Sequence, residues 1–423
     1  PYMANDYVSN TYTYLWWPME DYKDLSWQRI ADALRDPKMR RALWRMWYDR
    51  DYRLYDEVTG KSHTLDEWPL RSEYRVYVRR DVMAQIWDRG TVGPEALVDA
   101  APYAENHVTL AAETVFGEQG SGRGELQSPR GLAVGQDGSV YVADAGNHRI
   151  QVFSPEGEFV DSYGGRSLAE EESGAARGFN EPWDVAMGPD GSTYVADTWN
   201  HRVQKLDAEG RPVAAWGFFG EFKPDDGEAG EAGFYGPRGV AVGPALEGAG
   251  GNAGEDPLVY VTDTGNKRVQ VFGSDGAFAF QWGGGGAAEG YLDEPVGIAF
   301  GPGGDVYVAD TWNRRIQVFD GNGSFVRQWP IHGWDSGIPE EKPYLAVDGE
   351  GHVYVTDPGY YRVLVFDRAG EYLLSFGEYG TDEQSFALPQ GIAVAPDGSI
   401  YVSDAHANRI LGFAPIDFEQ YED

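Results

Sequence analysis

Short segments of alternating hydrophobic and polar residues repeat along most of the chain. Each repeat contains a Tyr-Val-x-Asp unit, and an arginine follows the aspartate by five residues. A long, nearly fixed period indicates copies of one supersecondary unit, so the pattern predicts six structural repeats. The units begin at Tyr141, Tyr194, Tyr260, Tyr307, Tyr354 and Tyr401, with successive separations of 53, 66, 47, 47 and 47 residues.

Four short strands are predicted in each repeat. A proline opens an apolar strand, and a turn such as Asp137-Gly138 leads to the Tyr-Val-x-Asp strand. A third alternating strand begins near the arginine, and a glycine turn then leads to a fourth strand that ends on an aromatic residue. This order predicts a four-stranded antiparallel meander.

The two ends of the repeat region predict a closed ring. The sixth repeat stops after its third strand near Phe413, whereas Thr114 to Gly117, ahead of the first repeat, has the ending of a fourth strand. Pairing of these segments would leave no open sheet edge. We therefore expect a mainly β protein: a six-bladed β-propeller over residues 111–415, a small N-terminal α/β domain over 1–110, and an acidic tail over 416–423.

The second and third strands resemble the NHL repeat family, in which Tyr-Val-x-Asp precedes Asn-x-Arg-Ile or Asn-x-Arg-Val. The matching segments are YVADAGNHRI, YVADTWNHRV, YVTDTGNKRV and YVADTWNRRI; YVTDPGYYRV has Tyr360 in place of the asparagine, and YVSDAHANRI shifts it to Asn408. The resemblance implies an NHL-type propeller that is closed by its N- and C-terminal strands. It leaves function open, because such folds serve as binding modules, sensor domains and enzymes.

Polar residues that recur in every repeat are predicted to be structural. Each aspartate–arginine pair would tie the loop between the second and third strands of its own blade; the alternative is an anion-binding ring. Asn147, Asn200, Asn266 and Asn313 are predicted to be turn residues in the left-handed conformation. The pairs are Asp144 and Arg149, Asp197 and Arg202, Asp263 and Arg268, Asp310 and Arg315, Asp357 and Arg362, and Asp404 and Arg409.

Positions that differ between repeats are candidates for binding a ligand or partner. The residue after each opening proline should lie near the central channel, where it would hold an anionic or sugar-like ligand or line a solvated funnel mouth. Trp199 and Trp312 share that face and would bind the ligand or pack over neighbouring blades, and a long connection there carries Phe218, Phe219 and Tyr235. The residues after the prolines are Arg130, Trp183, Arg238, Val296, Tyr344 and Gln390.

Composition narrows the chemistry. The net charge of -34 disfavours nucleic acid as a partner, because phosphates are bound mainly by lysine and arginine. The absence of cysteine excludes disulfides and thiolate nucleophiles. Among the seven histidines only His148 and His201 occupy equivalent repeat positions, and no Asp-x-Asp-x-Asp-Gly calcium loop occurs. We predict no catalytic residue, no metal and no cofactor.

Residues 1–110 have a helical and unusually aromatic pattern. Helices are predicted over 27–35, 37–48 and 81–90, with a strand over 74–79. The aromatic stripe would form a small core, or a surface for a membrane or partner. The stretches TYTYLWWPMEDY and WPLRSEYRVYVRRDVMAQIWDRG resemble the extracytoplasmic tail of polytopic, mannosyltransferase-like membrane proteins that use lipid-linked sugars. This resemblance implies no catalytic residue in the chain itself.

These patterns lead to one functional expectation and two alternatives. The chain is expected to be an extracytoplasmic, cell-surface or membrane-attached binding or scaffold domain that recognises a protein or glycan through the loop-rich propeller face. Its parent would be glycosyltransferase-like, with a membrane-embedded portion upstream of Pro1. The alternatives are a self-assembling structural protein, which would form homo-oligomers, and a propeller lyase or hydrolase.

Overall fold

The structure is a computed structural model that describes residues 54–56, 61–63, 103, 106–165, 178–221, 233–246, 256–334 and 342–418. The chain divides into two compact units, and the second, which comprises residues 106–334 and 341–423, contains the predicted repeats. In the first unit, β1 (Leu54–Asp56) and β2 (Lys61–His63) pair antiparallel. The helices and the strand predicted within residues 27–90 lie outside the described residues.

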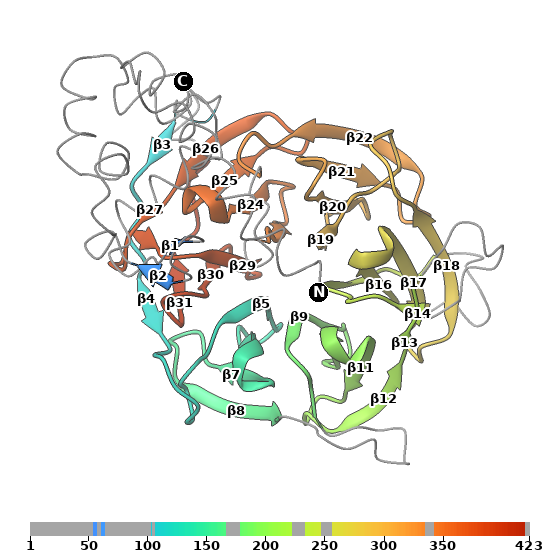
Figure 1. The fold of residues 1–423 in the computed structure, drawn as a ribbon, viewed down its shortest axis with the longest axis horizontal. Helices are drawn as coiled ribbons and strands as arrows, with labels where there is room; N and C mark the ends of the chain where they lie inside the picture. Colours follow the sequence, from blue (N-terminus) through green and yellow to red (C-terminus); the bar gives the residue numbers. More distant parts are fainter. Residues whose placement is uncertain are drawn as a thin grey trace. The chain divides into compact units, whose positions relative to one another are not determined.

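Six antiparallel sheets form a ring of blades (Figure 1). In the order of the chain, blade 1 consists of β5 (Pro129–Val134), β6 (Val140–Asp144), β7 (Arg149–Phe153) and β8 (Phe159–Gly164). Blade 2 consists of β9 (Pro182–Met187), β10 (Thr193–Asp197), β11 (Arg202–Leu206) and β12 (Pro212–Trp216). Blade 3 consists of β15 (Gly239–Gly243), β16 (Leu258–Asp263), β17 (Arg268–Gly273) and β18 (Phe278–Gly283).

The remaining blades complete the ring. Blade 4 consists of β19 (Pro295–Phe300), β20 (Val306–Asp310), β21 (Arg315–Phe319) and β22 (Phe325–Pro330). Blade 5 consists of β23 (Leu345–Val347), β24 (Val353–Asp357), β25 (Arg362–Phe366) and β26 (Tyr372–Phe376). Blade 6 consists of β29 (Pro389–Val394), β30 (Ile400–Asp404), β31 (Arg409–Phe413) and β4 (Thr114–Phe116). The predicted six-bladed, mainly β fold is confirmed.

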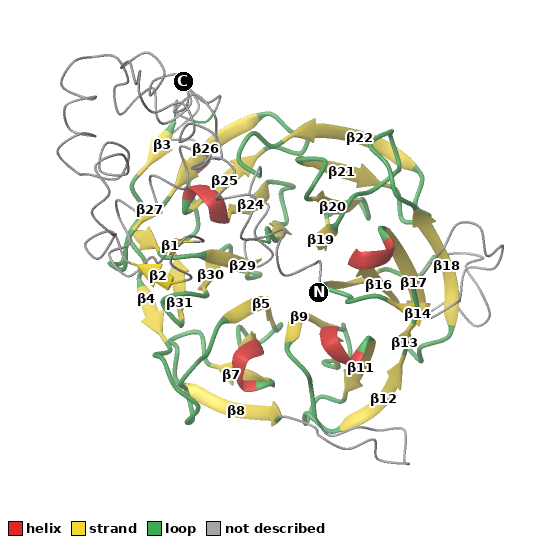
Figure 2. Ribbon diagram, viewed as in Figure 1, coloured by secondary structure: helices red, strands yellow, loops and turns green. Residues whose placement is uncertain are grey.

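Short 3-10 helices connect the second and third strands of four blades (Figure 2). They are η2 (Ala145–Asn147), η3 (Thr198–Asn200), η5 (Thr264–Asn266) and η6 (Pro358–Tyr360). Two short parallel pairs precede the first strands of blades 3 and 6. These pairs are β13 (Phe218–Phe219) with β14 (Gly233–Phe234), and β27 (Glu378–Tyr379) with β28 (Ser385–Phe386).

The ring closes through strands from opposite ends of the propeller, as predicted. β4 pairs antiparallel with β31, with Phe116 opposite Ile410 and Thr114 opposite Gly412. The preceding segment adds a feature that the repeat pattern did not predict, because β3 (His107–Val108) pairs parallel with β26 as a fifth strand of blade 5. Residues 107–116 therefore join two neighbouring blades.

Neighbouring blades interlock through glycine turns and aromatic side chains. Gly276, in the turn between the third and fourth strands of blade 3, has φ +87° and lies against the Trp216 ring of blade 2. A Cβ atom at Gly276 would lie 2.7 Å from that indole, so no larger residue fits without displacement. The same contact recurs between Gly323 and Trp282 and between Gly157 and Phe116. This packing explains why the fourth strands end on aromatic residues.

The closing strand provides a direct test of ring closure. Phe116 is 8% exposed and its ring centroid lies 4.9 Å from that of Phe153 in blade 1, whereas Val115 on the same strand is 43% exposed. We expect Phe116→Ala to lower the free energy of unfolding by about 3–5 kcal/mol, as other buried Phe→Ala changes do. Val115→Ala should change it by only about 0.5 kcal/mol. Urea unfolding of the full chain measures both, and equal effects would contradict closure through β4.

Candidate functional site

The two faces of the propeller differ in their connections. One face, here called the upper face, carries the loops between the second and third strands and the segments that lead from one blade into the next. The lower face carries the tight turns between the first and second strands and between the third and fourth strands. Most candidate residues from the sequence lie on the upper face, so its construction is described first.

A buried aspartate organises the upper end of each blade. These six blade carboxylates, at the end of each second strand, are fully buried and lie opposite the arginine that opens the third strand. In every blade Arg Nε donates to the aspartate at a distance of 2.6 to 3.2 Å. The blade carboxylates are Asp144, Asp197, Asp263, Asp310, Asp357 and Asp404.

Blade 4 shows what such a carboxylate holds. Oδ2 of Asp310 accepts hydrogen bonds from Arg315 Nε, Asn313 Nδ2 and Gln317 Nε2 at 2.6, 2.9 and 3.0 Å. Oδ1 accepts the backbone N–H of Asp293, in the segment that arrives from blade 3, at 2.6 Å. Burial raises the pKa of Asp310, while these hydrogen bonds oppose the shift. The carboxylate thus fixes its own loop and the incoming segment together.

The predicted left-handed conformation of four asparagines is wrong. Asn147, Asn200, Asn266 and Asn313 instead donate through Nδ2 to the carboxylate of their own blade. The left-handed residue is the next one along the chain, with φ between 53° and 59° in these four blades. The side chain that can reach the carboxylate is therefore asparagine, and the residue after it makes the turn. In blade 6, Asn408 occupies this left-handed turn position, with φ 55°.

The left-handed residue reaches the next blade in three places. Nδ1 of His148 accepts the N–H of Glu181 at 3.0 Å, and Nδ1 of His201 accepts the N–H of Gly236 at 3.2 Å. In blade 6, Oδ1 of Asn408 accepts the N–H of Ser128 at 2.8 Å. The sequence shows that the two histidines occupy equivalent repeat positions. That they accept hydrogen bonds from the next blade can be recognised only from the backbone geometry.

The upper mouth of the central channel is filled by side chains. The indole of Trp183 lies between two guanidinium groups, with Arg130 Cζ 3.7 Å and Arg238 Cζ 4.4 Å from its ring centre. Tyr344 Oη donates to the carbonyls of Trp183 and Arg238, and Arg130 donates to Gln390 Oε1 at 2.8 Å. These five residues, which were predicted as ligand contacts, therefore bind one another, and Val296 beside them is fully buried. Cation–π stacking and hydrogen bonding therefore hold these five predicted candidates against one another.

Two acidic residues complete this network. Glu294 bridges Arg238 at 2.7 Å and the buried Lys342 at 2.8 Å. Asp184, next to Trp183, accepts the N–H of Val240 at 3.0 Å, and its burial raises its pKa to about 8. Four other blades have glycine at the position equivalent to Asp184. The sequence therefore shows that this aspartate is an exception, but it does not indicate what the aspartate does.

Exposed aromatic residues gather on the upper face between blades 2 and 3. Trp199 in η3, Phe218 and Phe219 in β13, and Tyr235 after β14 are 41, 56, 59 and 38% exposed. Of these, Trp199, Phe219 and Tyr235 surround His201, and we call these three residues the aromatic cluster. The rings of Phe219 and Tyr235 meet edge to face at 5.6 Å. His201, which is half-buried, lies 4.9 Å from the Phe219 ring and 6.4 Å from the rings of Trp199 and Tyr235.

The structure thus separates the predicted candidates into two groups. Arg130, Trp183, Arg238, Tyr344 and Gln390 belong to the filled channel, whereas the aromatic cluster is available at the surface. Trp312, in the equivalent loop of blade 4, is 50% exposed, and Lys342 Nζ lies 5.7 Å from its ring centre.

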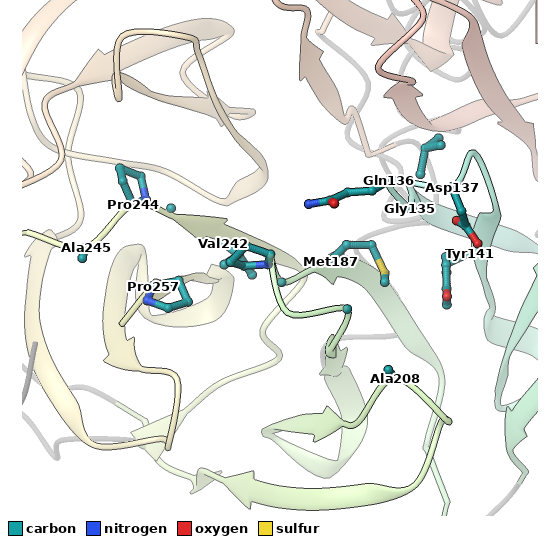
Figure 3. Close-up of a pocket in the computed structure, with 15 residues that line it drawn as sticks. Gly135, Gln136, Asp137, Tyr141, Met187, Ala208, Val242, Pro244, Ala245 and Pro257 are labelled. Atoms are coloured by element: carbon teal, nitrogen blue, oxygen red, sulfur yellow. The ribbon is translucent and has the colours of Figure 1, made fainter. Parts of the chain in front are cut away.

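The lower face carries a hollow of about 710 Å³ at the opposite end of blades 1 to 3 (Figure 3). It is lined by turns between first and second strands, including Gln136, Met187, Pro244 and Pro257. Its lining contains the side chains of Asp137 and Tyr141 but no histidine. Within the described ranges, no group of three or more His, Cys, Asp or Glu residues is placed to hold a metal ion.

Segments of the chain match the NHL repeat family and parts of larger proteins. The NHL repeat family is matched by residues 126–153, 179–206, 292–319 and 386–413. The chain is 35% identical over 99 residues to NHL repeat-containing protein 2 of Bos taurus and 45% identical over 58 residues to Protein lin-41 of Caenorhabditis elegans. These alignments cover 22% and 13% of this chain but only 14% and 5% of those proteins. Four of the six blades therefore contain a segment that matches the NHL repeat.

A longer similarity reaches a protein named as an enzyme. The probable peptidyl-alpha-hydroxyglycine alpha-amidating lyase pgal-1 of Caenorhabditis elegans is 25% identical over 219 residues, which is 51% of this chain and 54% of that protein. A gluconolactonase structure from Xanthomonas campestris superposes with a TM-score of 0.47 and 14% identity, over 73% of this chain and 98% of that one. This last likeness is one of fold. Among the helices that the structure describes, none is long and apolar enough to cross a membrane.

The buried Asp184 makes the stability of the propeller depend on pH in a defined direction. Its pKa is raised from 3.8 to about 8, so the folded state holds a proton that the unfolded state loses. The stabilising effect of this proton is complete below pH 3.8 and is lost as the pH rises through about 8. Asp184→Asn keeps an oxygen for Val240 N–H without a titrating group. The variant should gain a few kcal/mol relative to the natural protein between about pH 5 and pH 9.

Urea unfolding at both pH values measures this change. Asp161→Asn makes the same chemical change at an exposed position on β8 and is the matched control. A stability difference between Asp184→Asn and the natural protein that stays constant with pH would contradict the assignment.

Proposed function

We propose that the propeller is a binding domain that recognises a protein segment through the aromatic cluster on its upper face. The observation that carries the proposal is the exposure, between 38 and 59%, of Trp199, Phe219 and Tyr235 around one histidine. Exposed apolar groups that gather in this way are typical of interaction sites, and tryptophan and tyrosine are enriched among residues that dominate binding energy.

Order in the cluster supports binding rather than chance exposure. Trp199 Nε1 donates to Glu181 Oε2 at 2.9 Å, and the N–H of Tyr235 is held by the blade carboxylate Asp263 at 2.7 Å. The rings are therefore positioned before a partner arrives, which reduces the entropy that binding must overcome.

Charge indicates the chemistry of the partner. The chain has 68 acidic and 34 basic residues, and Glu181 lies directly beside the exposed Trp199 ring. A partner segment that carries arginine or lysine next to apolar side chains would satisfy both features, because the cation can stack on the indole and approach the carboxylate. The filled channel mouth supports recognition by the surface of the face rather than by the channel.

Three finer expectations from the sequence enter this proposal as alternatives or context. A glycan is the alternative ligand, since exposed Trp199 could also stack on a sugar ring. Self-association through the same cluster is the alternative for a structural protein. The extracytoplasmic setting and the membrane-bound parent are independent of which ligand the cluster binds.

Selection from a displayed library of random peptides tests the proposal with the full chain. We expect enriched peptides to contain basic and apolar residues and to bind with an affinity that Phe219→Ser lowers at least about tenfold. Val213→Ser, at a 53% exposed position on β12 of blade 2, should leave the affinity unchanged. Failure to enrich any peptide, or equal binding by Phe219→Ser, would contradict the proposal. Glycan-array binding that requires Trp199, or cluster-dependent oligomers in light scattering, would replace it with the corresponding alternative.

A further inference from the structure

Two histidines hold the backbone that carries the aromatic cluster. His148 and His201 occupy the same left-handed position of blades 1 and 2, with φ 58° and 53°. Each accepts a backbone N–H from the segment that enters the next blade, from Glu181 and Gly236 respectively. A ring nitrogen can accept a hydrogen bond only while it carries no proton, so both contacts require neutral imidazoles with the proton on Nε2.

Each of these two hydrogen bonds lies close to an exposed aromatic ring of the cluster. Glu181, held by His148, accepts the hydrogen bond from Trp199 Nε1 through its own side chain. Its backbone has φ 49°, a conformation that a residue before proline adopts only when its surroundings enforce it. Gly236, held by His201, follows Tyr235 in the chain. Loss of the two acceptors would therefore release both sides of the aromatic cluster.

The groups around the imidazoles set the direction of the effect. His201 faces Trp199 on its own loop, Phe219 on β13 and Tyr235 on the segment into blade 3. The nearest carboxylate on its own blade is Asp197, whose oxygens are engaged by Asn200 and Arg202, and Asp263 of blade 3 is engaged by Tyr235 N–H and Arg268. Desolvation lowers the pKa of His201, although Asp197 opposes the shift.

The surroundings of His148 follow the same plan. Asp144 on its own loop is engaged by Asn147 and Arg149, and Glu181 on the incoming segment turns its carboxylate to Trp199. Among the described residues, Nδ1 of each histidine therefore faces a backbone N–H rather than an unoccupied carboxylate.

We propose that His201 makes the aromatic cluster sensitive to pH, with the surface ordered when its imidazole is neutral and loosened when it is protonated, while His148 supplies the parallel backbone contact of blade 1. This inference rests on the proposed function only for its effect on binding. For His201 the lowered pKa means that the contact stabilises fully above the ordinary value of 6.5 and is lost as the pH falls below it. The cluster should therefore bind its partner more weakly in mild acid.

Blade 6 supplies an internal control. Asn408 occupies the same left-handed position and accepts the N–H of Ser128 at 2.8 Å through an amide oxygen, which does not titrate. His148→Asn and His201→Asn therefore copy an arrangement that the protein already uses. They retain an acceptor and remove the proton-binding group.

Hydrogen–deuterium exchange at single-amide resolution on the full chain tests the proposal without a partner. Between about pH 7.5 and pH 5.5, we expect the protection factor of Gly236 to fall about tenfold, and that of Ser128 to stay within about twofold. His201→Asn should hold the protection of Gly236 constant over the same range. Unchanged protection in the natural protein, or an equal loss at Ser128, would overturn the proposal.

A binding measurement separates this inference from the proposed function. With a peptide selected at about pH 7.5 as the probe, the dissociation constant should rise about tenfold at pH 5.5 for the natural protein. For the double Asn variant the ratio of the two constants should be about 1, whatever their absolute values. A peptide that binds equally at both pH values would overturn the pH-sensitive docking and leave the proposed function intact. If no peptide is selected, the proposed function fails, and the exchange experiment still decides the role of the histidines.

Discussion

The buried carboxylate at the upper end of each blade is the interaction on which the rest of the structure depends. Asp310 alone receives donors from Arg315, Asn313, Gln317 and the backbone of Asp293. Burying a carboxylate is costly, and removing one of several donors would leave a charge without compensation. Because the donors come from the loop of one blade and the segment that follows the previous blade, the same group shapes a blade and joins it to its neighbour.

This arrangement explains why the upper face can serve as a binding surface. Loops of a propeller are otherwise held only at their ends, but here Asp263 holds Tyr235 and Asp197 holds the loop that carries Trp199. The stack of Arg130, Trp183 and Arg238 closes the channel mouth at the same face. Trp199, Phe219 and Tyr235 lie on the same face as exposed side chains.

Much of the fold could be predicted from the sequence, because it depends on repetition. The spacing of six tyrosines gave the number of blades, and the missing fourth strand after Phe413 predicted closure through Phe116. Spacing also placed each aspartate opposite its arginine across adjacent strands. β3 has no counterpart in the repeats, so the repeat spacing could not predict that it adds a fifth strand to blade 5.

The candidate site was predicted less completely, because it depends on the directions of side chains and on contacts between different blades. Phe218, Phe219, Tyr235 and Trp199 were identified as candidates because they lie in long or variable connections, and the structure brings Phe219, Tyr235 and Trp199 together around His201. Arg130 and Trp183 were also identified, but their mutual stacking arises from strands of different blades that only the closed ring brings together. The acceptor role of His201 depended on which residue of Asn-His takes the left-handed conformation, and the sequence favoured asparagine on propensity alone.

The central claim is that the blade carboxylates hold the upper face in the form that binds. Comparing peptide affinity in Asp263→Asn and Asp310→Asn tests it most directly, because both change an equivalent buried group, yet only Asp263 holds Tyr235 whereas Asp310 holds Asp293. The account predicts a similar loss of stability in both variants, with weaker peptide binding confined to Asp263→Asn. Equal affinities in the two variants would contradict it.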